Sequence, residues 1–264
     1  MKHIITPPTT FYIARKENPY MTGKQITNNV FRQYEGLKNA VPAYEYSIQG
    51  RNVPDFVFIS NAGLSLPRLP KPVFILSTMK YKQRRNELPY IKNLMTQLGH
   101  TMIQLDTTFE GQAECAWFHN YTILVLGYGQ RTTYASVKRL ATLIPIIYNH
   151  YNITPPTIRF IQLVNPLFYH LDLALLSLNT SCIIQPDAFR DISSLSFTTI
   201  IPFPYKDNFA LNSVFRADTL VTHKVSSHIR KWYEKLGFHI LEVDMSEYEK
   251  SGGSVRCCVL DLFM

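Results

Sequence analysis

The chain has 264 residues, of which 46% are hydrophobic, and its formal net charge is +8. This apolar content is sufficient for a sizeable core and excludes a disordered chain. No run approaches the roughly 18 to 20 apolar residues of a membrane span, and the first residues lack the apolar core of a secretory signal, so we expect a cytoplasmic protein without a membrane partner. Basic residues are dense only over residues 80–85 and 224–235, which we interpret as solvated surface, so no nucleic-acid partner is expected.

The four cysteines, at positions 115, 182, 257 and 258, have neither metal-type spacing nor the pattern of a disulfide framework. Neighbouring residues of a strand point to opposite faces, so Cys257 and Cys258 would not ligate one ion. We therefore expect no metal site and no disulfide.

The first part of the chain reads as strands interrupted by helices. The expected strands are residues 10–14, 44–48, 55–60, 73–77 and 101–105, and the expected helices are residues 23–40 and 87–98. Gly99 is expected to end the second helix.

The later part repeats one order of elements: strand, turn, strand, helix, strand. The strand pairs are residues 113–119 with 121–127, 169–176 with 181–185 and 209–215 with 218–222; the helices are 133–151, 188–195 and 226–236; and the closing strands are 157–163, 198–203 and 239–244. A repeat of about 50 residues indicates modules that complete their cores against their neighbours. With a strand at 255–263 completing the first unit, we expect one α/β domain over residues 1–264, a closed ring of five modules. A doubly wound parallel sheet is the alternative, but its helices should alternate one-to-one with strands.

The stretch Ser251-Gly-Gly-Ser-Val-Arg-Cys257 predicts a nucleophilic thiol. Gly252 and Gly253 allow the backbone to turn close to a ligand, and Arg256 would favour the thiolate of Cys257. The alternative is a buried, inert cysteine in a C-terminal strand.

Ionisable residues recur where other predicted strands meet turns. His170 and Asp172 would share one face of a strand, where a carboxylate can position an imidazole for proton transfer. The alternative is a core histidine with a hydrogen-bonded aspartate. Glu110 and Glu114, four residues apart, could hold a cation or could simply be solvated. The other histidines are placed on surfaces or helix ends and are assigned no role.

Arg131 follows a strand that ends in glycines. Its planar fork can chelate a carboxylate. The alternative is a loop arginine before a helix that Thr132 or Thr133 caps.

Seven motifs, in this order along the chain, together resemble the guanidine-modifying pentein superfamily, most closely the branch of arginine dihydrolases and dimethylarginine-hydrolase-like proteins. The resemblance runs from about Pro7 to Leu262. The motifs are Asn18-Pro-Tyr-Met, Pro54-Asp-Phe-Val-Phe-Ile-Ser-Asn-Ala-Gly-Leu64, Phe109-Glu-Gly, Gly127-Tyr-Gly-Gln-Arg-Thr, Phe168-Tyr-His-Leu-Asp, Phe209-Ala-Leu-Asn-Ser-Val214 and Gly252-Gly-Ser-Val-Arg-Cys. The resemblance implies a propeller of five ββαβ modules with pseudo-fivefold symmetry.

The resemblance also implies that Cys257 attacks a guanidinium carbon, that His170 is the general acid and base, and that Glu110 orients His170. Substrate-binding roles go by position to the remaining motif residues: Asn18, Asn61, Lys80, Glu114, Arg131, Asp172 and Asn212. The deiminases of the superfamily carry an aspartate where this chain has Asn61. An amide both donates and accepts hydrogen bonds, so it suits a guanidinium and also the ureido oxygen of citrulline.

The implied reaction converts L-arginine to ornithine, two molecules of ammonia and carbon dioxide through a covalent thiouronium, without a metal or other cofactor. Two departures leave the substrate open between free, methylated and protein-borne arginine: Glu114 stands where the family has aspartate, and Lys80 where arginine is usual. A dimethylarginine hydrolase or an arginine deiminase, which stop at citrulline, is the first alternative, and an amidinotransferase is another. A non-catalytic binding module belongs to a different class, and a homo-oligomer is compatible with all of these.

Overall fold

The structure is a computed structural model that describes residues 1–13, 15–48 and 52–264. Within these ranges the strands form five separate three-stranded sheets. No helix in the described part of the chain is both long enough and apolar enough to cross a membrane.

Every sheet has the same pairing, in which the middle strand is antiparallel to one neighbour and parallel to the other. In sheet order the strands are β15 (Leu260–Leu262), β1 (Lys2–Ile5) and β2 (Tyr44–Glu45); β3 (Gly63–Ser65), β4 (Val73–Leu76) and β5 (Thr101–Gln104); β6 (Cys115–Phe118), β7 (Ile123–Tyr128) and β8 (Thr157–Gln162); β9 (Leu175–Ser177), β10 (Ser181–Ile184) and β11 (Thr199–Pro202); β12 (Val214–Arg216), β13 (Thr219–His223) and β14 (His239–Val243). The repeated order of elements predicted from the sequence is therefore present.

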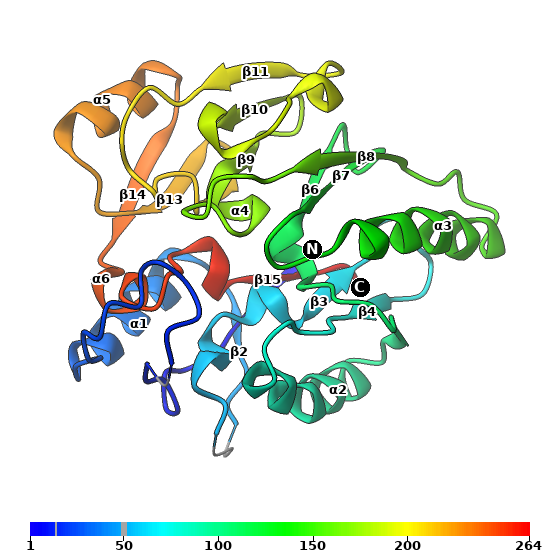
Figure 1. The fold of residues 1–264 in the computed structure, drawn as a ribbon, viewed down its shortest axis with the longest axis horizontal. Coiled ribbons are helices and arrows are strands. Elements are labelled where there is room, and N and C mark those ends of the chain that lie inside the picture. Colours follow the sequence, from blue (N-terminus) through cyan, green and yellow to red (C-terminus); the bar gives the residue numbers. More distant parts are fainter. Residues whose placement is uncertain (14, 49–51) are drawn as a thin grey trace.

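Helices connect the parallel strands of four sheets: α1 (Asn29–Ala40), α2 (Leu88–Gln97), α3 (Tyr134–His150) and α5 (Ser227–Lys235). They lie at the periphery of the ring of sheets in Figure 1. Gly99, with a φ of 71°, follows α2 as expected, and the Thr133 side chain caps α3 by accepting from the Ser136 amide. Helix α1 begins six residues after the expected start at residue 23, because the segment before it is irregular.

Three expected elements are wrong. Residues 10–13 are not in a strand, and residue 14 lies outside the described residues; the first strand is β1, near the N-terminus. The expected strand 55–60 is two buried 3-10 turns, η1 (Pro54–Val57) and η2 (Ile59–Ala62), because a short run that is buried on all sides fits a helical turn as well as a strand. The expected helix 188–195 is also replaced by two 3-10 turns, η5 (Pro186–Ala188) and η6 (Ser193–Leu195).

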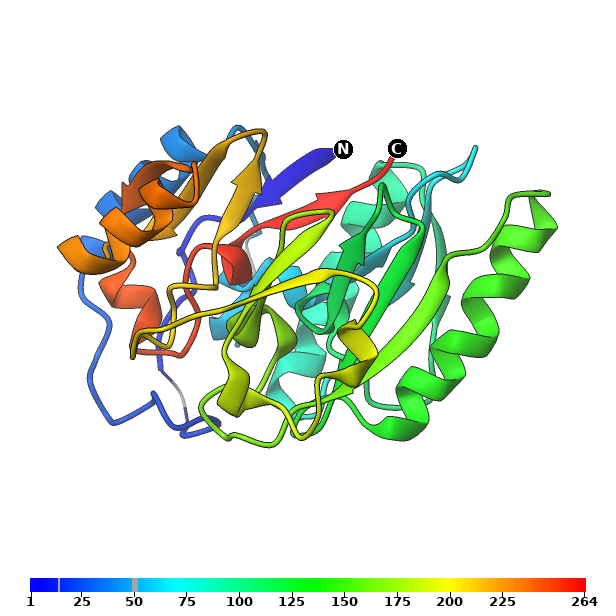
Figure 2. The same cartoon turned by 90° about the horizontal axis from the view of Figure 1, so that it is seen from above.

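The two ends of the chain complete one sheet. β1 pairs antiparallel with β15, His3 lying opposite Asp261, and both views show the termini side by side (Figures 1 and 2). The prediction that the C-terminal strand completes the first unit is confirmed, although this strand is shorter than expected.

The core is shared between adjacent units. One apolar cluster joins Ile4 of β1 and Leu260 of β15 to Phe74 of β4 and Met95 of α2. Burial of this kind stabilises each unit only when its neighbour is present.

Candidate active site

Helical turns carry the polar residues of the site. A turn precedes the first strand of each sheet: η2 before β3, η4 (Gly111–Glu114) before β6, α4 (Leu171–Ala174) before β9, a turn at residues 209–212 before β12, and η7 (Arg256–Cys258) before β15. Asn61, Glu114, Asp172, Asn212 and Cys257 lie within these turns, and Glu110 and His170 directly precede η4 and α4. The strands expected to begin at residues 113, 169, 209 and 255 therefore start later than predicted. His170 and Asp172 do not share a strand face.

The turns approach one another very closely. Gly111 has a φ of 70°, and a Cβ there would lie 2.8 Å from the Gly63 amide nitrogen and 2.9 Å from the carbonyl carbon of Asn61. Only glycine allows this contact between two backbones, and the contact brings Asn61 beside Glu110.

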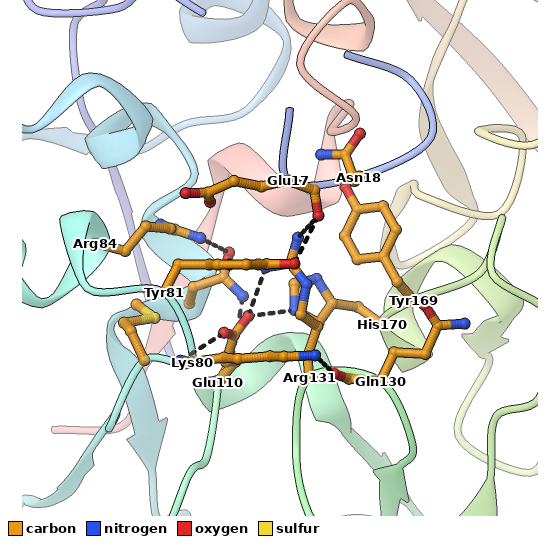
Figure 3. A network of polar contacts seen from close by, with 12 residues as sticks. Glu17, Asn18, Lys80, Tyr81, Arg84, Glu110, Gln130, Arg131, Tyr169 and His170 are labelled. Atoms are coloured by element: carbon orange, nitrogen blue, oxygen red, sulfur yellow. Dashed lines mark hydrogen bonds and ion pairs between the residues drawn. The ribbon is translucent and has the colours of Figure 1, made fainter. Parts of the chain in front are cut away.

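Glu110 binds both Arg131 and His170 in the network of polar contacts in Figure 3. Its Oε2 accepts from His170 Nε2 at 2.8 Å and from Arg131 Nη1 at 3.1 Å, and its Oε1 accepts from the Lys80 amide at 3.0 Å. Burial alone would raise the pKa of Glu110, but Arg131 and His170 lower it, so the carboxylate is ionised.

His170 is neutral at physiological pH. Burial lowers its pKa to about 4, although the bond to Glu110 acts in the opposite direction. A neutral imidazole that donates from Nε2 keeps a lone pair on Nδ1, and no group among the described residues is hydrogen-bonded to Nδ1. The ring can therefore accept a proton.

Cys257 is buried, with 4% of its surface exposed, and lies between Asn212 and Asp172. Asn212 Nδ2 donates to Sγ at 3.2 Å, and the thiol donates to Asp172 Oδ2 at 3.6 Å. Burial and the Asp172 carboxyl raise the pKa of Cys257 well above its ordinary value. The resting group is a thiol.

Arg256 and the Cys257 thiolate attract each other, as expected, but burial and Asp172 outweigh this attraction in the resting state. Arg256 also donates to Asp261, with Nη2 2.6 Å from Oδ2. Burial raises the pKa of Asp172 to about 7, although Arg256, Cys257 and Asn212 act in the opposite direction.

A cavity of about 20 Å³, the size of one water molecule, lies beside these groups. Five of the predicted site residues line it: Asn18, Asn61, Arg131, His170 and Cys257. The other five, Lys80, Glu110, Glu114, Asp172 and Asn212, are not in its lining. Of these, Glu110, Asp172 and Asn212 contact a lining residue through the bonds above.

Asn18 and Arg131 are both engaged with the backbone near the cavity. Asn18 Nδ2 donates to the Ser251 carbonyl at 2.9 Å, and Arg131 Nη2 donates to the Glu17 carbonyl at 3.2 Å. The guanidinium of Arg131 also lies between the rings of Tyr81 and Tyr169, 4.6 and 4.7 Å from their centroids. Such stacking holds a planar cation in one orientation.

Lys80 lies at the protein surface beside the site, whereas Glu114 lies in the protein interior. The exposed Lys80 extends its Nζ to the Gln130 carbonyl, 2.6 Å away. Glu114 is completely buried, with Oε2 accepting from the Leu171 amide at 3.2 Å and Oε1 without a partner among the described residues. Burial, Glu110 and Asp172 raise the pKa of Glu114 well above its ordinary value.

Sequence reasoning missed three contributors. Arg84 is only 5% exposed and lines the cavity, although residues 80–85 were interpreted as solvated surface. Tyr81 and Tyr169 enclose Arg131, and the position of Tyr169 directly before His170 was an available signal. The only sequence signal for a buried Arg84 is Glu87 three residues later, and this spacing is equally typical of an exposed ion pair on a helix.

Three histidines that were assigned to surfaces or helix ends are buried, namely His3, His100 and His223. His223 lies between two carboxylates, 2.9 Å from Glu249 Oε1 and 3.1 Å from Asp207 Oδ1. Within the described ranges, no three His, Cys, Asp or Glu side chains are grouped as a metal site.

No protein-family model matches the chain. Among curated proteins, it is 27% identical over 278 residues to the bifunctional arginine dihydrolase/ornithine cyclodeaminase AgrE of Nostoc sp., an alignment that covers 98% of this chain and 37% of AgrE. It is 24% identical over 274 residues to N(G),N(G)-dimethylarginine dimethylaminohydrolase of Mycobacterium tuberculosis, which covers 99% of this chain and 85% of that enzyme. The chain thus spans little more than a third of the bifunctional relative.

Solved structures give the same relationship. The N-terminal domain of ArgZ, an arginine dihydrolase from Cyanobacteria in complex with its substrate, superposes with a TM-score of 0.84 at 25% identity and covers 98% of this chain and 97% of that one. AgrE in complex with L-arginine superposes with a TM-score of 0.85 at 25% identity, covering 98% of this chain and 40% of AgrE. The chain is therefore similar to arginine dihydrolases and to a dimethylarginine dimethylaminohydrolase, and it shares the α/β fold of repeated small sheets with the solved arginine dihydrolases.

Proposed function

We propose that this protein hydrolyses the guanidinium group of L-arginine and is an arginine dihydrolase. The observation that carries the proposal is that the Cys257 thiol and the neutral His170 line the same cavity. His170 Nε2 is in turn 2.8 Å from the ionised Glu110. A thiol, an imidazole and an orienting carboxylate are the parts of covalent catalysis at an electron-poor carbon. The relationship to arginine dihydrolases supports arginine as the substrate.

In the first step, Cys257 attacks the guanidinium carbon. The incoming cation lowers the pKa of the buried thiol, and His170 Nδ1 takes its proton. His170 returns this proton to a departing amino group, which leaves as ammonia, and the carbon remains bound to sulfur as a cationic thiouronium. Glu110 stabilises the imidazolium through the 2.8 Å bond.

Water completes the first round. His170 accepts a proton from water as the oxygen adds to the thiouronium carbon, the C–S bond breaks, and the products are citrulline, the restored thiol and one proton. If citrulline stays bound, a second attack releases the second ammonia, and hydrolysis of the thiocarbamate gives a carbamate that decomposes to ornithine and carbon dioxide. Asn61 and Asn18 are proposed to hold the ureido group, because an amide can donate to its oxygen.

The substrate needs more room than the structure offers. A cavity of about 20 Å³ does not admit arginine, so the groups around it must separate when the substrate enters. The Glu17 carbonyl, which accepts from Tyr81 at 2.9 Å and from Arg131 at 3.2 Å, is proposed to be displaced. This frees Arg131 for the α-carboxylate of the substrate, with Lys80 at the rim beside it.

The direct test is an incubation of purified protein with L-arginine, followed by amino-acid and ammonia analysis. We expect ornithine and two equivalents of ammonia, and no turnover by Cys257→Ser. Equal turnover by both proteins would contradict the assignment of the nucleophile.

Citrulline as the final product would favour the second candidate, a one-round hydrolase. The relationship to a dimethylarginine dimethylaminohydrolase supports this candidate. Parallel incubation with dimethylarginine separates it from a deiminase, because only the former would release dimethylamine.

We further propose that the five sheets and their connections are five ββαβ modules around a pseudo-fivefold axis, and that residues 1–264 are one domain. The common strand pairing and the shared core clusters support both statements. A cytoplasmic location remains a prediction, supported by four cysteines that are all free thiols.

A further inference from the structure

Arg84 is a buried guanidinium in the wall of a cavity that we propose to bind another guanidinium. It belongs to the 3-10 turn η3 (Gln83–Glu87), is 5% exposed and lines the same cavity as His170 and Cys257. Figure 3 shows Arg84 at the edge of the polar network that contains His170. A second positive charge so close to a cationic substrate weakens substrate binding unless a carboxylate neutralises it.

Glu87 neutralises and immobilises Arg84. Nε donates to Glu87 Oε1 at 2.8 Å, and Nη2 donates to Glu87 Oε2 at 3.0 Å, so one edge of the guanidinium meets both oxygens of one carboxylate. Nη2 is also 3.2 Å from the Asp55 carbonyl. A bidentate pair of this kind leaves the guanidinium no rotational freedom.

The remaining edge of the fork is directed at Asn61. Arg84 Nη1 donates to Asn61 Oδ1 at 2.9 Å, while Asn61 Nδ2 donates to the Glu110 carbonyl at 3.1 Å. A flipped amide would place its NH2 group against the guanidinium and its oxygen against a carbonyl, which removes two hydrogen bonds and creates two repulsive contacts. The orientation of the amide is therefore determined.

In this orientation Asn61 keeps one lone pair on Oδ1 and one N–H on Nδ2 that no described protein group uses. The lone pair can accept from a guanidinium N–H, and the N–H can donate to a ureido oxygen. We propose that Arg84 is a positioning residue that locks the Asn61 amide so that both hydrolytic rounds can use it without a flip. This inference rests on the proposed two-round function.

Loss of Arg84 should affect the second round more than the first. The cationic guanidinium is also attracted by the carboxylates of the site, whereas neutral citrulline depends on directed hydrogen bonds.

The test is the double variant Arg84→Met/Glu87→Met, which removes both charges at once and avoids leaving either one buried alone. We expect kcat/KM for citrulline to fall about tenfold more than kcat/KM for arginine, with citrulline accumulating from arginine, as the loss of a charge-assisted hydrogen bond predicts. The matched control is Arg230→Met/Glu234→Met at a partly exposed pair in α5, which should leave both values unchanged.

Arg84→Lys provides an independent measurement if the double variant does not fold, as judged by circular dichroism. Lysine keeps the charge but lacks the fork that reaches Glu87 and Asn61 together, so it should also lower citrulline turnover selectively. Equal losses on both substrates would mean a purely structural role and would overturn the inference. Wild-type protein that forms no ornithine would instead overturn the two-round function on which it rests.

Discussion

Glu110 is ionised although none of its surface is exposed. Burial without partners would force such a carboxylate to take up a proton, but the Lys80 amide, His170 and Arg131 replace its water shell. The nearby Glu114, with only the Leu171 amide as donor among the described residues, has its pKa raised instead. The pKa values of the two glutamates are thus shifted in opposite directions: Arg131 and His170 lower that of Glu110, whereas burial, Glu110 and Asp172 raise that of Glu114.

Glu110→Gln is expected to lower kcat for arginine by about 10² to 10⁴-fold, because the neutral amide cannot stabilise the imidazolium of His170. Steady-state kinetics with arginine measure the effect. The matched control is Glu247→Gln, which removes a buried carboxylate bonded to Thr27 and Lys250 outside the cavity lining. A similar loss of kcat in both variants would contradict the role of Glu110.

At the scale of elements, the glycine turn before η7 determines how closely other segments approach the nucleophile. Gly252 has a φ of 94°, and a Cβ there would lie 2.5 Å from Tyr169 Oη and 2.7 Å from Asn18 Nδ2. The Gly252 carbonyl accepts from Tyr169 at 2.5 Å. The turn is therefore in direct contact with two groups next to the cavity.

Gly252→Ala should lower kcat/KM more than tenfold, because the added methyl group displaces Asn18 and Tyr169. Gly237→Ala is the matched control: Gly237 has nearly the same φ, 91°, but nothing in the described part of the chain lies within 4 Å of the point that a Cβ would occupy there. Both variants should lose about 1 kcal/mol of stability from backbone strain, and only Gly252→Ala should lose activity. Equal activities would show that the close approach does not matter.

His223 joins three segments near the same turn. It lies at the end of β13 between Asp207 and Glu249, and Glu249 also accepts from Ser254 Oγ at 3.0 Å. Burial alone would lower the pKa of His223, but its two carboxylate partners raise it to about 9. The folded protein therefore holds this proton more tightly than the unfolded chain, whose histidine has a pKa near 6.5.

The stabilisation from the His223 proton should be fully present below pH 6.5 and disappear as the pH rises to about 9. The expected loss is about 3 kcal/mol, because the pKa of His223 rises from 6.5 in the unfolded chain to about 9 in the folded protein. Urea unfolding of wild type and His223→Gln at pH 6 and pH 9.5 measures it. A difference between the two proteins that is the same at both pH values would refute the linkage.

At the scale of the whole molecule, neighbouring units stabilise one another through their shared cores. Leu260 of β15 is completely buried against β4 and α2, only three residues beyond Cys257. The packing of β15 against β4 and α2 therefore also supports the segment that carries the nucleophile. Stability and activity are therefore coupled at this seam.

Leu260→Ala should lower the free energy of unfolding by about 2 to 5 kcal/mol, because it leaves a cavity between two units. Leu241→Ala on β14, where 42% of the residue is exposed, is the matched control and should cost well under about 1 kcal/mol. Urea denaturation of both variants measures these losses. Equal losses in the free energy of unfolding would contradict a particular contribution of Leu260 at the contact between the two units.

The amino-acid sequence alone was enough to predict the repeated order of elements, the pairing of the chain ends and five of the residues that line the cavity. Motif order and hydrophobic periodicity carry this information, because they depend on local patterns. It did not distinguish strand from helical turn at residues 55–60 or 169–176, since a short run buried on every side satisfies both periods.

Only the tertiary structure decided the states of the ionisable groups. Arg84 is buried rather than solvated because Glu87 and Asn61 saturate its fork, and His170 is neutral because burial outweighs its bond to Glu110. The thiol of Cys257 is protonated because burial and the Asp172 carboxyl raise its pKa well above the ordinary value. Most of these partners lie far apart in the chain, and electrostatic energies depend on distance and solvent exclusion, which no local pattern records.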